Sequence, residues 1–355
     1  MKTLLLLLFC ILSMHSNAQE ESWIEVRPKL GFLIAHRSIM GHVVDEHAVA
    51  TEFSYYFKGN GERYWHEPYN NPRYGVSGFV GTVGNRDLFG IYYGAYGFMS
   101  MPLIHTKRFT FSGRLGAGLS VAPKVYHHET NNLSIATSTH VNALVSMAVE
   151  SRYEIGPHAV NAIIDMTHFS NGAAKVPNLG LNVPFVSLGY GYRIREAQIE
   201  IVPRFSDVNP KYWEFGAVGV VSVKEVYPVG GKKYPCFGVN LMGRRYFRPQ
   251  VGMEVSLDFM YKSSLQTYAP DVPMTIADQF QMGIFVGYLM PFYRFHIITG
   301  MGYYLRDKYG FQEPVYHRVG MRYVFKNGLN INCVLKSHWA RADYVEYGIG
   351  YTFKR

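Results

Sequence analysis

The chain has 355 residues, a formal net charge of +9 at pH 7, 15% aromatic residues and only 17% charged residues. Beyond the first residues, no stretch approaches the roughly 18 consecutive apolar residues of a membrane helix, and no nucleic-acid-binding module is visible. The composition therefore argues against a helical membrane protein and against a nucleic-acid-binding protein. The positive charge could favour an anionic partner such as a phosphorylated lipid, or it could reflect a basic surface without a specific partner.

The first segment, residues 1–18, is predicted to be a secretory signal peptide. Its apolar run, Leu4–Met14, is too short to span a bilayer, and small residues follow it before Gln19. The mature chain would then lie in an oxidising compartment. Its two cysteines, Cys236 and Cys333, could form one disulfide or remain unpaired on strands.

Short segments with alternating apolar and polar residues follow along the rest of the chain. We predict strands at about 23–35, 46–57, 73–82, 88–102, 106–121, 139–155, 157–168 and 183–194, and then at about 211–225, 234–247, 249–263, 275–289, 291–304, 315–326, 328–339 and 343–354. Tight turns alternate with long loops, and bacterial barrels place the short turns in the periplasm and the long loops outside. The sequence thus predicts an all-β fold, an antiparallel transmembrane β-barrel of about 16 strands.

Two features lie outside this strand pattern. Trp65, Trp213 and Trp339, with the many tyrosines, are expected at the membrane interface. The run His127–Glu129 could bind a metal, but a solvated polar loop is the favoured interpretation because no further ligands can be located. The sequence therefore predicts no metal and no cofactor.

The strand over 157–168 leads into a histidine and a serine two residues apart, His168 and Ser170. Side chains two residues apart on a strand point to the same side of the sheet. Here that side also carries Ile164 and Met166, whereas the opposite side is mostly polar. His168 and Ser170 are therefore predicted on the lipid-facing side. An enzyme whose substrate is a membrane lipid would need a base and a nucleophile placed there.

Neighbouring residues could complete a hydrolytic site. Ester hydrolysis by a serine needs a third group that orients the histidine, and donors that hold the oxyanion. Asn182 shares the parity of the bulky face of the next strand and could meet His168 on the lipid-facing side. Asn171, Asn178 and the backbone near Gly172 are candidate oxyanion donors. On spacing alone, a polar strand end at the membrane interface explains the His-x-Ser pair better.

A wider motif surrounds this pair: residues 168–172 are His-Phe-Ser-Asn-Gly, residues 177–180 are Pro-Asn-Leu-Gly, and residues 189–193 are Gly-Tyr-Gly-Tyr-Arg. The motif resembles the outer-membrane lipid A 3-O-deacylase family (PagL-like), whose members are also described as acyloxyacyl-hydrolase-like. The resemblance covers about residues 20–195 and is specific around 160–194. It implies an eight-stranded barrel with a Ser-His-Glu triad on its outer surface, which cleaves the acyl chain ester-linked at position 3 of lipid A.

Carried onto this chain, the resemblance implies that His168 is the base and Ser170 the nucleophile, and that Asn171 and Asn178 are tied to the oxyanion site. The family's acid lies twelve residues after the serine, where this chain has Asn182. An amide oxygen can accept the imidazole N–H and hold its tautomer, but it carries no charge to stabilise an imidazolium. This departure predicts weaker turnover unless another acid helps.

The second half of the chain looks like a degenerate copy of the first. Met101-Pro102 and Met290-Pro291 are each followed by an Arg-Phe pair and a glycine, and His168 has a counterpart in His338. Ala340 stands where the nucleophile would fall, so only the first half could carry it. This second half lies outside the pattern of the family that the motif resembles.

The predicted domains are therefore a signal peptide over 1–18, a deacylase-like barrel half over 19–195 and a second barrel half over 196–355. Residues 195–210 would form the joint, and they lack the composition of a long flexible linker. For this reason we expect one large barrel made from two eight-strand repeats, in preference to two separate barrels of eight strands.

The resulting functional hypothesis is a serine esterase in the outer membrane of a Gram-negative bacterium, with its active site facing the outer leaflet. Its partner would be a membrane lipid, lipid A or lipopolysaccharide, from which it removes an ester-linked acyl chain. The alternatives are a non-enzymatic pore or lipid-transport barrel with a degenerate motif, and a structural or surface-interaction barrel. His168 and Ser170 favour the esterase, whereas Asn182 and the large second half favour the alternatives. The acyl position and length and the oligomeric state stay open.

Overall fold

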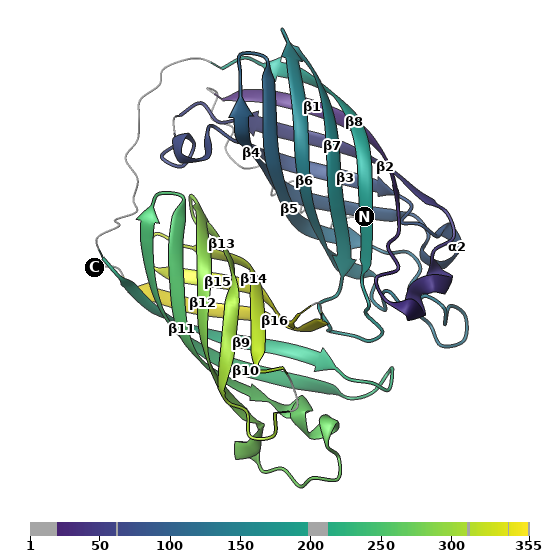
Figure 1. Cartoon of the computed structure of the whole chain (residues 1–355), viewed down its shortest axis with the longest axis vertical. Coiled ribbons are helices and arrows are strands. Elements are labelled where there is room, and N and C mark those ends of the chain that lie inside the picture. Colours follow the sequence, from purple (N-terminus) through teal and green to yellow (C-terminus); the bar gives the residue numbers. More distant parts are fainter. Residues whose placement is uncertain (1–19, 62, 198–211, 311–312, 340, 354–355) are drawn as a thin grey trace. The chain divides into compact units, whose positions relative to one another are not determined.

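The computed structural model describes residues 20–61, 63–197, 212–310, 313–339 and 341–353. The predicted signal peptide, most of the predicted joint, and Ala340 lie outside the described residues. The described chain forms two compact units (Figure 1). One contains strands β1–β8, and the other contains β9–β16 together with residues 172–178 of the loop between β7 and β8. None of the described helices is long and apolar enough to cross a membrane.

Both units consist of eight strands with short helices in the loops. The first contains β1 (Glu21–Phe32), β2 (His47–Lys58), β3 (Arg73–Gly81), β4 (Tyr92–His105), β5 (Phe109–Val121), β6 (Val141–Ile155), β7 (His158–Ser170) and β8 (Leu181–Arg195), with η1 (Ser38–Val43), η2 (Glu67–Tyr69) and α2 (Arg86–Phe89). The second contains β9 (Glu214–Glu225), β10 (Lys233–Arg248), β11 (Val251–Lys262), β12 (Phe280–Phe292), β13 (Phe295–Arg306), β14 (Val315–Val324), β15 (Leu329–His338) and β16 (Arg341–Phe353), with η3 (Ser263–Tyr268) and η4 (Ile276–Gln279). Every strand predicted from the sequence overlaps one of these strands.

Each unit closes on itself as an antiparallel barrel. In the first, β1 pairs with both β2 and β8. In the second, β9 pairs with both β10 and β16. The all-β barrel fold and its two eight-strand halves are confirmed, but the expectation of a single large barrel was wrong. The first strand of each half pairs with the last strand of the same half, and eight strands suffice to close a barrel that side chains can fill.

The strands show the alternation that a lipid-facing barrel requires. In β7 the side chains of Asn161, Asp165 and Thr167 are buried inside the barrel, while Val160 and Ile164 are exposed on the outside. The other strands of the first barrel repeat this pattern with exposed valines, leucines, isoleucines and aromatic residues. An apolar exterior around a polar interior is the arrangement of transmembrane barrels, because lipid surrounds the outside.

Buried charges in the lumen of the first barrel are paired. Glu52 forms ion pairs with Arg27 and with Lys29, whose Nζ lies 2.8 Å from Glu52 Oε1. Lys29 Nζ also lies 3.0 Å from Asp165 Oδ2. All four side chains are almost fully buried. Pairing of this kind offsets the cost of removing charges from water.

The loops after β1, β3, β5 and β7 pack together at one end of the first barrel. The backbone N–H of Gly180 donates to the carbonyl of Ala136 (2.9 Å), and that of Asp45 donates to Gly84 (3.1 Å). These contacts tie Gly180, directly before β8, to loop 122–140, and loop 33–46 to loop 82–91. Apolar side chains fill the space behind them and belong to the main core cluster: Leu33, Met40, Val43, Val83, Phe89, Ala122, Ala136 and Leu181. The end of β7 is therefore held in a packed environment.

The second barrel has a charged interior of its own. Lys262 Nζ lies 2.6 Å from Asp343 Oδ2, and both side chains are fully buried. Cys236 is buried and Cys333 is exposed, and both are free thiols. The disulfide that the sequence left open is therefore not formed.

One of the three tryptophans expected at the membrane interface lies elsewhere. Trp65 is buried, with its ring centroid 4.4 Å from that of His66 and 5.0 Å from that of Tyr74. Trp213 and Trp339 are exposed. The expectation was therefore wrong for Trp65, because its ring packs against Tyr74 on β3 and is buried there.

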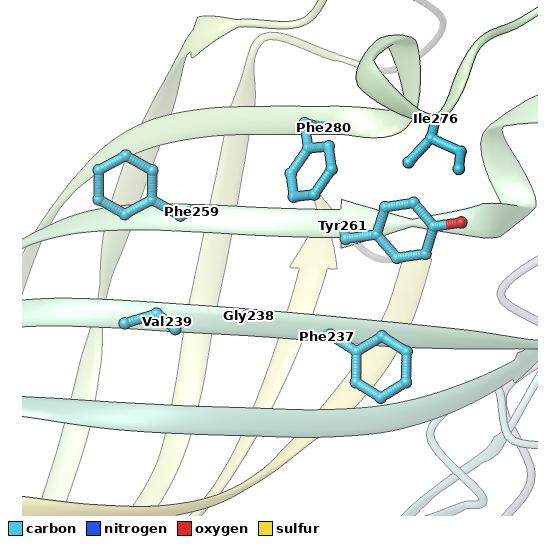
Figure 2. Close-up of a pocket in the computed structure, with 7 residues that line it drawn as sticks. All are labelled: Phe237, Gly238, Val239, Phe259, Tyr261, Ile276 and Phe280. Atoms are coloured by element: carbon cyan, nitrogen blue, oxygen red, sulfur yellow. The ribbon is translucent and has the colours of Figure 1, made fainter.

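An apolar groove lies on the outer face of the second barrel (Figure 2). Seven residues line it: Phe237, Gly238 and Val239 on β10, Phe259 and Tyr261 on β11, Ile276 on η4, and Phe280 on β12. The lining has no imidazole, carboxylate or aliphatic hydroxyl group, so it contains no base and nucleophile for ester hydrolysis.

Candidate active site

His168 and Ser170 lie at the C-terminal end of β7, where the alternation of buried and exposed side chains continues. Both side chains are half-buried and share the outer face with the exposed Val160 and Ile164, whereas Phe169 between them is buried inside the barrel. Side chains along an extended strand alternate between its two faces, so residues that lie an even number of positions from Ile164 also point outward. The structure thus places both side chains on the outer face of the sheet, the face on which the sequence predicted them.

Asn182 stands directly opposite His168 on the neighbouring strand. The two residues are register partners of β7 and β8, and His168 Nδ1 lies 2.6 Å from Asn182 Oδ1. The imidazole N–H donates and the amide oxygen accepts, so the proton of a neutral His168 sits on Nδ1. Nε2 then keeps the lone pair that a general base needs. The contact expected from strand parity is present, and its catalytic role stays a prediction.

Ser170 follows His168 by two residues on the same face. Two residues of extended strand separate their Cα atoms by about 6.6 Å. The hydrogen bonds of the described residues include none between Ser170 Oγ and His168. Such a bond is often long without substrate, and side-chain rotation can close it. Across the strand pair, Ser170 faces the small side chain of Ala143, which leaves room beside the hydroxyl group.

Loop 171–180 contains the predicted oxyanion residues. Asn171 directly follows Ser170, and its Nδ2 donates to Ser138 Oγ at 3.3 Å. Gly172 and Ala173 both have left-handed backbones, with φ of 64° and 69°, so the chain turns sharply just after the serine. Asn178 lies near the end of the same loop. The loop thus keeps amide donors close in sequence to Ser170, and their part in holding an oxyanion stays a prediction.

Gly180 brings the end of this loop against the His168 ring. Its φ is 76°, and a Cβ atom built on it would lie 2.8 Å from His168 Cε1. Only glycine fits there without displacing the imidazole or straining the backbone. The glycine of the Pro-Asn-Leu-Gly segment was visible in the sequence, but its contact with the ring depends on how the loop returns to β8.

His36, in the loop after β1, was not expected at the site. Asn182 Nδ2 lies 3.2 Å from His36 Nδ1, and His36 Nε2 lies 3.1 Å from the carbonyl oxygen of Leu179. The backbone N–H of Ile34 donates to the carbonyl of Asn182 at 2.9 Å, which holds this loop beside β8. His36 carries no motif of its own, so only the folded chain reveals it.

The acids on the preceding strand do not reach His168. Glu150 faces the lumen, where it binds Arg73 with an Nη1–Oε1 distance of 2.8 Å. Glu154 lies near the other end of β6 and pairs with Arg152. Neither carboxylate lies where it could accept a hydrogen bond from His168, so neither supplies the acid that the motif resemblance implies at this place.

No group of three or more His, Cys, Asp or Glu side chains within the described ranges is arranged to hold a metal ion. The His127 and His128 rings stack 4.8 Å apart. His128 and Glu129 are both well exposed, with a distance of 3.6 Å between His128 Nε2 and Glu129 Oε1. The cluster is a solvated loop tip in this structure.

The histidine of the second half faces the opposite side of its sheet. His338 at the end of β15 is buried in the lumen, where its Nε2 lies 3.1 Å from Tyr304 Oη and its Nδ1 lies 3.8 Å from Asp343 Oδ2. His168 faces outward. The weak repeat aligned these two residues, but the second barrel does not present His338 to the outer surface.

The surface around the first site is apolar. On β6, Val145, Met147 and Val149 are exposed; on β8, Val186 and Leu188 are exposed. Val145 is the register partner of His168, so the apolar face begins directly beside the imidazole. A hydrocarbon chain lying along this face could place a bond near its end within reach of His168 and Ser170.

Comparison with protein families gives two matches along the chain. Residues 49–193 match the family described as lipid A 3-O-deacylase (PagL). Residues 211–355 match the family described as acyloxyacyl hydrolase, C-terminal domain. The second match corrects the expectation that the second half lies outside the family pattern. No curated protein matches the chain.

Comparison with solved structures finds β-barrels of low similarity. A mutant of the Rhodopseudomonas blastica porin has 9% identity and a TM-score of 0.17, with 94% of this chain and 100% of that chain covered. The FrpB iron transporter from Neisseria meningitidis has 9% identity and a TM-score of 0.22, with 86% and 63% covered. The siderophore receptor PirA from Pseudomonas aeruginosa has 9% identity and a TM-score of 0.21, with 94% and 80% covered. Superpositions of this quality support no argument about function.

Proposed function

The chain belongs to the lipid A 3-O-deacylase (PagL) family, and from this premise we propose that it is an outer-membrane serine esterase. It removes an ester-linked acyl chain from lipid A or a related acylated glycolipid. The observation that carries the proposal is the outward-facing hydrogen bond between His168 and Asn182, with Ser170 on the same face at the edge of an apolar surface.

In the proposed mechanism Asn182 orients the imidazole, and His168 and Ser170 carry the chemical steps. His168 Nε2 takes the proton of Ser170 Oγ as that oxygen attacks the ester carbonyl carbon. Amide donors of loop 171–180 hold the oxyanion of the tetrahedral intermediate. His168 then gives its proton to the departing sugar oxygen, which leaves as a hydroxyl group. The same histidine takes a proton from a water molecule that attacks the acyl-serine ester, and it returns this proton to Ser170 Oγ as the fatty acid is released.

The proposed substrate follows from where the site lies. A water-soluble ester would gain little from a site on the outside of a barrel. An acylated glycolipid of the membrane would place its hydrocarbon chains along Val145, Met147 and Leu188, with its ester near the strand ends. With the N-terminus in the periplasm, the β7–β8 loop is on the outer side, where lipopolysaccharide is found.

Asn182 is the feature that favours a non-enzymatic barrel, because the family acid is missing. A pore is less well supported, since the lumen of each barrel contains fully buried charged side chains such as Arg152 and Lys262. The amide of Asn182 still accepts from the imidazole, so the orientation that a base needs is retained. We therefore favour a slow esterase over a barrel without activity.

Mass spectrometry of lipid A tests this proposal. Cells whose lipid A carries all its ester-linked chains would express wild-type protein, Ser170→Ala, or Ser38→Ala, which changes an exposed serine in η1 of the same barrel. We expect loss of one acyl chain with wild type and Ser38→Ala, and intact lipid A with Ser170→Ala. Heat-modifiable migration in gels would show that all three barrels fold. Equal lipid A in wild-type and Ser170→Ala cells would contradict the esterase proposal.

A further inference from the structure

Two polar side chains from separate segments, Asn182 and His36, lie beside the proposed base, His168. His168 Nδ1 lies 2.6 Å from Asn182 Oδ1, Asn182 Nδ2 lies 3.2 Å from His36 Nδ1, and His36 Nε2 lies 3.1 Å from Leu179 O. The Asn182 amide therefore stands between two imidazole rings, with one polar atom toward each.

With neutral rings, one assignment of donors satisfies all three contacts. Leu179 O is only an acceptor, so His36 Nε2 carries the proton and His36 Nδ1 is an acceptor. Asn182 Nδ2 then donates to His36, and Asn182 Oδ1 accepts from His168 Nδ1–H. His36 Nδ1 also lies 3.4 Å from Ile34 O, which in this assignment is a contact without a hydrogen bond. His168 Nε2 is left with its lone pair.

The opposite orientation of the amide breaks this chain of contacts. Asn182 Nδ2–H would face His168 Nδ1 and force the His168 proton onto Nε2, which removes the base. Asn182 Oδ1 would face His36 Nδ1, which would then need its proton there. The lone pair on His36 Nε2 would in consequence face the carbonyl oxygen of Leu179. A carboxylate has no such problem, because both of its oxygens accept.

We infer that His36 is a positioning residue that holds the Asn182 amide with its oxygen toward His168, and thereby keeps the base in its active tautomer. The inference rests on the proposed esterase function. It also explains how the chain tolerates an amide where the family has an acid. The His36 ring accepts a hydrogen bond from Asn182 Nδ2 and so fixes which end of the amide faces His168. His36 is itself placed by the backbone bond from Ile34 N–H to Asn182 O.

The prediction for His36→Ala is lower kcat for lipid A deacylation, by about tenfold or more, the size of loss that follows when a hydrogen-bonding partner that orients a metal-bound histidine is removed. His42→Ala is the matched control, because His42 lies in the same loop and its Nε2 contacts a backbone carbonyl, Leu133 O, at 3.0 Å without reaching Asn182. Activity of His42→Ala should equal that of wild type. A loss with both substitutions would indicate a general disturbance of the loop and overturn the inference.

The decisive comparison repeats His36→Ala in an Asn182→Asp background. The aspartate offers an acceptor to His168 in either orientation, so the effect of His36→Ala should disappear there. A purely structural role of His36 would produce the same loss in both backgrounds and would overturn the inference. If wild type and Ser170→Ala leave lipid A equally intact, the esterase proposal itself has failed, and the kinetic comparison does not apply.

Nitrogen NMR of the imidazoles tests the same inference without activity. In ¹⁵N-histidine-labelled protein in detergent, His168, assigned by its loss in His168→Gln, should show the Nδ1–H tautomer in wild type. In His36→Ala its signals should shift toward a mixture of tautomers, and in His42→Ala they should stay unchanged. An unchanged His168 tautomer in His36→Ala would overturn the inference.

Discussion

At the residue scale, the proposed site depends on which atom of each side chain faces its neighbour. Asn182 and His168 are register partners, so the strands place them together. The direction of the amide then decides the tautomer of the imidazole. Serine esterases usually use a carboxylate here, which orients the ring and also stabilises its charged form. Asn182 can do the first of these only.

Replacing Asn182 separates these two contributions. In serine proteases an amide in place of the acid lowers kcat by about 10⁴, mainly because the histidine then adopts the wrong tautomer. Here Asn182 already holds His168 in the tautomer that a base needs. We therefore expect Asn182→Glu to raise the rate of deacylation by only about tenfold. Asn182→Ala should lower it. Lipid A mass spectrometry over time, in membranes with matched protein levels, gives the three rates. Equal rates for all three proteins would remove Asn182 from the mechanism.

Gly180 offers a second test at this scale. Gly180→Ala would place Cβ 2.8 Å from His168 Cε1 and strain a backbone with φ of 76°. Gly156→Ala is the control for strain alone, because Gly156 has φ of 58° with nothing within 4 Å of an added Cβ. Both variants should lose about 1–2 kcal/mol of stability from the left-handed backbone. Deacylation should fall strongly in Gly180→Ala only; equal activity of the two variants would show that the ring contact is unimportant.

At the scale of the elements, successive side chains of each strand point alternately to the outside of the barrel and into its lumen. The outer positions of β7 need only be apolar, whereas the inner positions must find partners for their charges across the barrel. Asp165 on β7 meets Lys29 on β1, and Lys29 also meets Glu52 on β2. The lumen contacts therefore connect strands that are far apart in sequence.

Glu52→Gln tests the contribution of this network. The substitution leaves Arg27 and Lys29 buried with one carboxylate partner fewer each, and breaking a buried pair costs about 3–5 kcal/mol. Urea unfolding of the protein in lipid vesicles, followed by tryptophan fluorescence, would measure the loss. Glu129→Gln, at an exposed loop position, should leave the midpoint unchanged. A midpoint for Glu52→Gln equal to that of wild type would show that the lumen charges contribute little to stability.

At the scale of the whole molecule, the chain forms two closed barrels in place of the single barrel that we expected from the sequence. All strand pairs of the first barrel lie within β1–β8, and all those of the second lie within β9–β16. Neither barrel therefore needs a strand of the other to satisfy its backbone hydrogen bonds in lipid.

This independence predicts that the first barrel works alone. A chain of residues 1–197 should insert into the outer membrane, show heat-modifiable migration, and deacylate lipid A, whereas a secreted form of residues 212–355 should fold without this activity. Ser170→Ala in the shorter chain is the control for activity. A folded but inactive 1–197 chain would mean that the second barrel contributes to turnover.

The sequence by itself determined the strands and the face of each side chain. The period-two alternation is a local property of extended backbone, so the outward direction of His168, Ser170 and Asn182 followed from parity alone. The same parity, applied to the end of β15, places His338 in the lumen. The roles of Ser170, Asn171, Gly172 and Asn178 in catalysis follow from the motif and remain predictions.

Only the tertiary structure decided which strands close the sheet and which loops reach the site. Pairing of β1 with β8 in place of β16 depends on contacts between residues far apart in sequence, and alternation is equally compatible with either closure. His36 and Gly180 approach His168 because loops that no pattern describes return to the same barrel end. Trp65 was misplaced for the same reason. Local periodicity sets where a side chain points, and the folding of loops over long sequence separations sets what it meets there.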